Sequence, residues 1–236
     1  MPPPRAYVPL RPRHGGSFYD DVGRNPAPSG PSRAKSSQAY RLGIAKQEEF
    51  THSCGATGLL CAAMELGRTR LWNGCPIDTE PAQAERLLFQ FINRIPPERD
   101  LQAEGESVPT WFIEAIRRLE LDGHLHVVPP IDSSLVAMFG GGIMEEIRSM
   151  RIHLQNGPEE PLGPHQRRLR MVIFVPHPTG PEPAPNRLRY VLERPDGTVM
   201  DPATGQNHDN PGQLNQRTKA GRYADTGVSV VITDPH

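Results

Sequence analysis

The spacing of hydrophobic positions changes at about residue 170 of the chain. Before that point, apolar residues recur every three or four positions, which is typical of helices with one buried face. The helices expected from this spacing cover residues 54–66, 81–95, 107–119 and 143–154, with a shorter helical stretch over 131–139. Capping residues, an early Pro or a closing Gly mark several of their ends.

After residue 170, short apolar runs separated by turn residues predict strands instead. These strands cover residues 171–175, 188–192, 197–200 and 228–232, and a further short strand is expected over 124–128. Pro195-Asp196-Gly197 predicts a tight turn between the second and the third. Helices first and strands second predict an α+β fold, with an N-terminal helical half packed on a small C-terminal antiparallel sheet.

The first 38 residues differ in composition from the rest of the chain. Residues 1–38 are rich in Pro, Gly, Ser and Arg and have no sustained periodicity, so we interpret them as a disordered tail. A non-cleaved secretion signal, of the kind that injected bacterial effectors carry, has a similar composition. Residues 39–236 are expected to form a single folded domain.

The charge and cysteine content exclude several classes of protein. A net charge of −1 at pH 7 gives no reason to expect nucleic acid as a partner. Neither a long apolar span nor a conventional signal peptide is evident, so we expect no membrane partner. Three Cys at unrelated spacing predict free thiols. The protein is therefore expected in the cytoplasm, or secreted without a conventional signal peptide, as an injected effector would be.

Cys54 is the strongest candidate for chemistry. It lies at or just before the first turn of the first predicted helix, which ends near Gly67. The N–H groups and partial positive charge of a helix N-terminus favour the thiolate, which is the nucleophilic form. Cys61 lies inside the apolar run of the same helix and is expected to be a buried, inert core residue.

Two further residues could complete a thiol-dependent amidase. Asp201 ends a predicted strand, where a carboxylate could orient an imidazole on the neighbouring strand. Gln47 lies upstream of Cys54, and its side-chain amide could donate hydrogen bonds to the oxyanion. The expected substrate is a protein or peptide.

These residues resemble the papain-like cysteine peptidases. The motifs that match are Gln47, Cys54-Gly55-Ala56 with its apolar helix, and Asp201-Pro202-Ala203. The branch that trims leader peptides from bacteriocins is the most similar, and papain-like deamidases injected by bacteria share the plan. The resemblance implies a papain-like fold and a Cys, His, Asp and Gln catalytic set.

The resemblance implies a catalytic histidine at the start of the strand over 188–192, but Arg187 and Arg189 stand there. His177, in the preceding Pro- and Gly-rich loop, is the histidine that we predict as the general base, and His208 and His52 are further candidates. Two functions stay open. The chain is either a peptidase or deamidase with Cys54 as nucleophile, or an inactive papain-like module that binds a protein partner.

No cofactor or metal is expected. His124 and His126 would lie on the same face of a strand, where they could bind a metal, but solvated strand histidines are the favoured interpretation. Gly140-Gly141-Gly142 lacks the following Lys of a phosphate-binding loop and is interpreted as a hinge.

Overall fold

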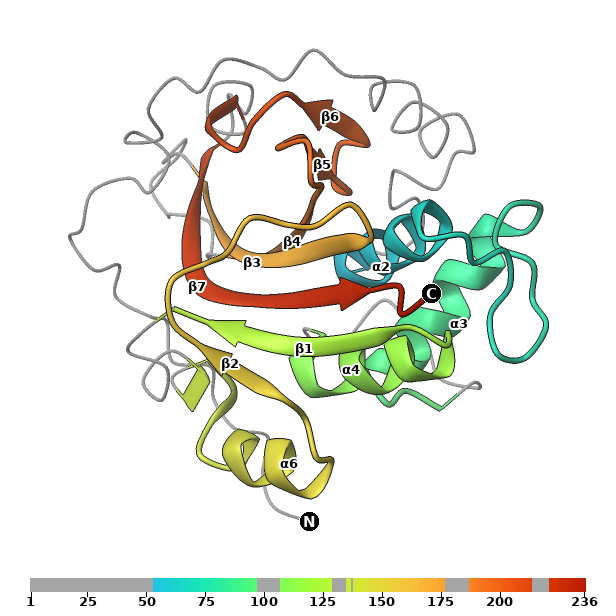
Figure 1. The fold of residues 1–236 in the computed structure, drawn as a ribbon, viewed down its shortest axis with the longest axis horizontal. Helices are drawn as coiled ribbons and strands as arrows, with labels where there is room; N and C mark the ends of the chain where they lie inside the picture. Colours follow the sequence, from blue (N-terminus) through green and yellow to red (C-terminus); the bar gives the residue numbers. More distant parts are fainter. Residues whose placement is uncertain (1–52, 97–106, 129–134, 137, 177–186, 214–220) are drawn as a thin grey trace.

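A computed structural model describes residues 53–96, 107–128, 135–136, 138–176, 187–213 and 221–236 (Figure 1). The helices are α2 (Cys54–Glu65), α3 (Pro81–Ile92), α4 (Pro109–Arg118) and α6 (Ile143–Ser149). The strands are β1 (Asp122–Val127), β2 (Leu154–Asn156), β3 (Gln166–Pro176), β4 (Arg187–Glu193), β5 (Val199–Asp201), β6 (Gln206–His208) and β7 (Gly221–Thr233). The predicted tail, residues 1–38, lies outside the described residues.

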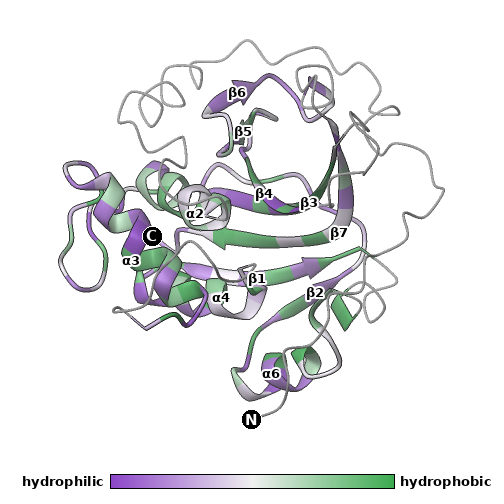
Figure 2. Cartoon of the chain, turned by 180° about the vertical axis from the view of Figure 1, so that it is seen from behind, coloured by the Kyte–Doolittle hydropathy of each residue, from purple (hydrophilic) through white to green (hydrophobic). Residues whose placement is uncertain are grey.

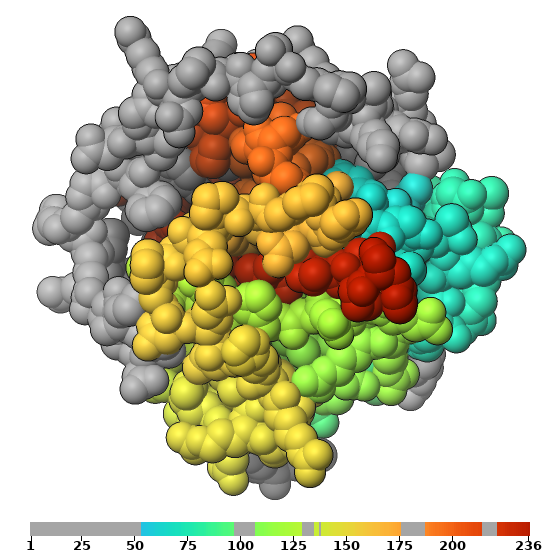
Figure 3. All heavy atoms as spheres, in the orientation of Figure 1, coloured from blue at the N-terminus to red at the C-terminus, as the bar shows by residue number. Residues whose placement is uncertain are grey.

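The strands form one sheet in the order β2-β1-β7-β3-β4-β5-β6. The pairs are antiparallel except β1 with β2, which is parallel. In the space-filling view the red C-terminal part of the chain lies between the orange β3 region and the green β1 region (Figure 3). The α+β prediction is confirmed. The expectation of a small antiparallel sheet is wrong, because β1 and β2 from the middle of the chain extend it to seven mixed strands.

Helices α2, α3 and α4 cover one face of this sheet (Figure 2). Helix α2 packs on β3, β4 and β5, whereas α4 packs on β1 and β7. Helix α3 contacts both α2 and α4. Every residue of α2 from Cys54 to Ala63 is buried, which explains why this helix is apolar or small all round rather than amphipathic.

Two glycines allow the N-terminal half of α2 to approach its neighbours closely. A β-carbon added at Gly55 would lie 2.5 Å from Phe112 Cζ and 3.2 Å from Tyr190 Cδ2. One added at Gly58 would lie 2.7 Å from Leu169 Cδ2. An added side chain would force Phe112 or Leu169 to shift, so these glycines allow the short distance between the helix and its neighbours.

The sheet is strongly curled at a bulge in β7. Arg170 pairs with Ser229 and Val172 with Asp225, so Thr226 to Val228 stand opposite a single residue of β3. Gly227 has φ +73°, which suits glycine, and Thr226 donates its hydroxyl to the Met171 carbonyl at 2.8 Å. The bend that follows is visible where β7 turns away from β1 in Figure 1.

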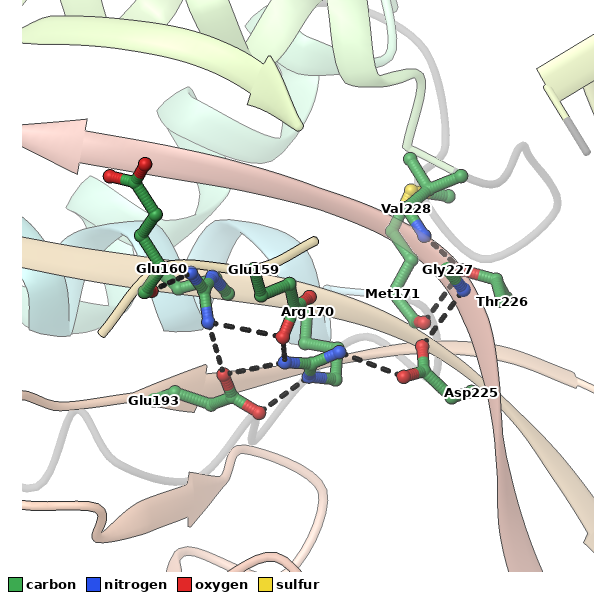
Figure 4. Close-up of polar contacts among 10 residues, drawn as sticks. Glu159, Glu160, Arg170, Met171, Glu193, Asp225, Thr226, Gly227 and Val228 are labelled. Carbon is green, nitrogen blue, oxygen red and sulfur yellow. Dashed lines mark hydrogen bonds and ion pairs between the residues drawn. The ribbon is translucent and has the colours of Figure 1, made fainter. Parts of the chain in front are cut away.

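Arg170 is the centre of a buried ion cluster beside this bulge (Figure 4). Its guanidinium pairs with Asp225 at 2.8 Å and with Glu193 and Glu159. Arg168 contacts Glu159 at 3.3 Å and donates to the Glu160 carbonyl at 2.9 Å. The cluster joins β3, β4, β7 and the segment before β3, so it fixes the bend.

Several predicted elements differ in detail. The helix expected over 143–154 ends at Ser149, and Leu154 begins β2, which the sequence did not reveal. Strand β6 was also not predicted. The predicted strand over 124–128 is confirmed as β1, but His126 on it is 2% exposed, so the expectation that it is solvated is wrong.

In the described part of the chain, no helix is long and apolar enough to cross a membrane.

The close approach at Gly55 predicts a stability effect. Gly55→Ala should lower the free energy of unfolding by about 1–3 kcal/mol, because Phe112 is fully buried and cannot move away freely. Gly141→Ala is the control, since no atom lies within 4 Å of the added carbon. Denaturant unfolding measures both. Equal stability of the two variants would show that α2 does not pack as described.

Loss of Arg170 should be more damaging. Arg170→Leu leaves Glu193, Asp225 and Glu159 without their shared cation, so we expect a loss of about 3–5 kcal/mol in unfolding free energy. Arg148→Leu removes an exposed arginine from α6 and should change stability by less than about 0.5 kcal/mol. A similar small change in Arg170→Leu, measured by urea unfolding, would contradict the role of the cluster.

Candidate active site

Cys54 is the first residue of α2, as the sequence predicted. The helix starts with the Thr57 N–H donating to the Ser53 carbonyl at 2.9 Å. Ser53, at the N-cap, uses its hydroxyl to donate to the Glu85 carboxylate of α3 rather than to cap the helix. Cys54 is 3% exposed, so its sulfur is almost completely shielded from solvent.

The sulfur faces the start of β4. Strand β5 pairs with β4 only at Leu192 and Glu193, and therefore does not cover the edge of β4 at Arg189 and Tyr190. The N-terminus of α2 takes this place. The Tyr190 backbone N–H and the Arg189 side chain both form hydrogen bonds with the Cys54 thiol.

Asp201 lies close to the same thiol, at the end of β5. Its Oδ2 accepts a hydrogen bond from the Tyr223 hydroxyl at 2.9 Å, and its Oδ1 accepts one from the Ala203 N–H at 2.9 Å. Tyr223 is on β7, although β3 and β4 lie between β7 and β5 in the sheet. This contact is possible because the sheet curls at the β7 bulge.

Burial and electrostatic interactions among these groups shift the pKa values of Cys54 and Tyr223. Burial raises the pKa of the Cys54 thiol above its ordinary value; Arg189 and the Tyr190 N–H oppose that rise, and the negative charge of Asp201 adds to it. The expectation that the helix N-terminus gives Cys54 a lowered pKa is therefore wrong, because burial outweighs the favourable donors. Burial, followed by the charge of Asp201, also raises the pKa of Tyr223, which stays a protonated hydrogen-bond donor.

The predicted site residues are only partly brought together. The structure places Cys54 and Asp201 in one cluster, as expected from the sequence. Gln47 and His177 lie outside the described residues, so their roles stay predictions. His208 is buried on β6 opposite Val199. Among the described residues, the groups that shift the pKa of Cys54 besides burial are Arg189, Tyr190 and Asp201, and none is a histidine.

Sequence reasoning missed two members of this cluster. Arg189 has a signal, since it stands at the strand start where the papain-like resemblance implies a histidine. Tyr223 has none, because nothing in the sequence relates it to Asp201.

His124 and His153 lie with ring centroids 5.4 Å apart, but within the described residues no group of three or more His, Cys, Asp and Glu could hold a metal ion.

A thiol at the N-terminus of a buried helix, close to a carboxylate at the end of a sheet strand, defines a cysteine peptidase type of α+β protein. The comparisons give the particular family. Residues 46–235 match the family described as "Invasion plasmid antigen J, cysteine protease", and the chain belongs to that family.

One curated relative is the cysteine protease IpaJ of Shigella flexneri. It is 28% identical to this chain over an alignment of 213 residues, which covers 81% of this chain and 78% of that protein. No solved structure matches the chain significantly. The predicted membership of a thiol peptidase class is thus confirmed, whereas the bacteriocin-processing branch stays a prediction.

The contact between Asp201 and Tyr223 predicts a change in tyrosine ionisation. Asp201→Asn removes the negative charge that raises the pKa of Tyr223, so that pKa should fall, while burial still holds it above the ordinary value of about 10. The pKa of Tyr223 is measured in the wild type and in Asp201→Asn by following tyrosinate absorbance during an alkaline titration. The signal of the matching protein that also carries Tyr223→Phe is subtracted, so that Tyr223 alone is followed. Asp209→Asn, at an exposed carboxylate, should leave the titration unchanged. An unaltered midpoint in Asp201→Asn would contradict the contact.

Proposed function

We propose that this protein is a thiol-dependent hydrolase that cleaves an amide bond in a protein or peptide substrate, with Cys54 as the nucleophile. The observation that carries this is the proximity of Cys54 and Asp201, which are far apart in sequence, within a chain of a cysteine protease family. The amide is either a peptide bond or a side-chain amide.

In this reaction the Cys54 thiolate attacks the substrate carbonyl carbon, and the carbonyl oxygen becomes an oxyanion. Collapse of this intermediate expels the amine or ammonia and leaves an acyl-enzyme, which water hydrolyses. The Tyr190 N–H stabilises the thiolate before attack. Gln47 is the proposed oxyanion donor, as the papain-like resemblance implies.

His177 is the proposed general base and acid. In the sequence it directly follows Pro176, the last residue of β3. Phe174 of β3 pairs with Arg187 of β4, two positions before Arg189, so β3 ends beside the start of β4. His177 therefore follows in sequence from the end of β3 that lies beside the start of β4, and Cys54 faces the start of β4. Asp201 would orient the imidazole.

The substrate is proposed to be a protein outside the cell that makes this enzyme. The family description names an invasion antigen, and the relative from Shigella flexneri is named a cysteine protease. The family description supports the prediction of an injected effector, and both names support the prediction of a protease. A second function, an inactive module that binds a protein, is favoured by one observation: the described partners of Cys54 include Arg189 but no histidine.

A paired substitution tests the role of Cys54. Cys54→Ala should abolish hydrolysis and change the unfolding free energy by about 1 kcal/mol or less. Cys61→Ser should keep the activity but lose about 1–3 kcal/mol of stability, since Cys61 is 0% exposed and the new hydroxyl would be buried.

The activity is measured by mass spectrometry on a proteome-derived peptide library. New N-termini identify a peptidase, and conversion of Gln to Glu identifies a deamidase. Denaturant unfolding gives the stability of each variant. Products that persist with Cys54→Ala would overturn the assignment of the nucleophile, and a library unchanged by the wild-type protein would favour the binding module.

A further inference from the structure

Arg189 occupies the position next to Cys54 from which a papain-like site would present its imidazole. We propose that Arg189 is a cationic partner of the Cys54 thiolate, at the strand position where the papain-like resemblance implies a histidine. This inference rests on the proposed function, because it concerns the same nucleophile, but it assigns the charge partner to a residue that never loses its proton.

The fold brings the two side chains together by backbone placement. Gly55 follows Cys54 and lies against Tyr190, where a β-carbon would be 3.2 Å from the ring. Tyr190 follows Arg189 on β4, and its N–H reaches the sulfur. The next turn of α2, at Gly58, contacts Leu169 of the neighbouring β3. The helix therefore fixes Cys54 against the start of β4, within reach of the Arg189 side chain.

A guanidinium and an imidazolium differ in what they can do for a thiolate. Both stabilise the negative charge and donate hydrogen bonds to sulfur. A guanidinium has a pKa above about 12, so it stays charged and neither accepts the thiol proton nor donates one to a leaving amine. The thiol proton therefore leaves to solvent or to a separate base, such as the proposed His177, and Arg189 acts only through its fixed charge.

Among the described residues around Cys54, the Tyr190 N–H also favours the thiolate, whereas the other side chains oppose its ionisation or are neutral. Asp201 on β5 is the nearby negative charge, and Tyr223 on β7 stays protonated against it. On α3, Glu85 accepts a hydrogen bond from Ser53 beside the start of α2. Among the described groups, Arg189 on β4 is thus the cation that offsets both the carboxylate and burial at the sulfur.

The test measures the ionisation of Cys54 directly. The ultraviolet absorbance of the thiolate is followed against pH for the full chain, and the signal of Cys54→Ala is subtracted, so the reading needs neither substrate nor reagent access. Arg189→Met keeps an apolar stem of similar length but removes the charge. We expect the midpoint to rise by about one to three pH units.

Arg189→Lys restores a cation and should recover at least half of that shift. Arg187→Met, at an exposed arginine two residues earlier on the same strand, should leave the midpoint unchanged. Arg189→His should add a second ionisation near pH ~6.5, where imidazole titrates. The thermal unfolding temperature of each variant confirms that it is folded.

The outcomes separate this inference from the proposed function. An unchanged midpoint in folded Arg189→Met, or equal shifts in Arg189→Met and Arg189→Lys, would overturn the role of Arg189, whatever the activity. A shift that Lys reverses supports it, even if the peptide library shows no hydrolysis. In that case the thiolate pair would exist in a protein that is not a hydrolase.

Discussion

The structure depends on how closely the N-terminal half of α2 can approach the sheet. Gly55 and Gly58 have no side chain, and any β-carbon there would lie within 3 Å of Phe112 or Leu169. This contact decides where the first residue of the helix lies. Because the helix is buried on all sides, its direction is fixed by packing, and Cys54 is fixed with it.

The second half of the site depends on the curl of the sheet. A flat sheet would keep Tyr223 and Asp201 apart, with β3 and β4 between them, but the bulge in β7 bends the strand and the hydroxyl reaches the carboxylate at 2.9 Å. The Arg170 cluster stands beside the bulge and binds Asp225, the residue where the pairing resumes. The Arg170 ion cluster thus holds the bend in β7, and that bend brings Tyr223 to Asp201.

The electrostatics of the site are a balance between burial and donors. Burial raises the pKa of Cys54, and the charge of Asp201 adds to the rise. Arg189 and the Tyr190 N–H act in the opposite direction. A protein in which the thiol is only a core residue does not need a cation beside it, whereas a nucleophile with a carboxylate nearby does. This difference is the physical reason to connect Arg189 with the chemistry of Cys54.

The sequence by itself determined that helices come first and most strands follow, though not β2 and β6, and it determined the start of α2 at Cys54 and the place of Asp201 at the end of a strand. Local signals were enough for these, since they depend on apolar periodicity and on turn residues such as Gly67 and Gly197. Only the tertiary structure decided that β1 and β2 join the sheet, that Tyr223 meets Asp201, and that burial raises the pKa of the thiol. Strand pairing, curl and solvent exclusion arise between residues distant in sequence, so no local pattern encodes them.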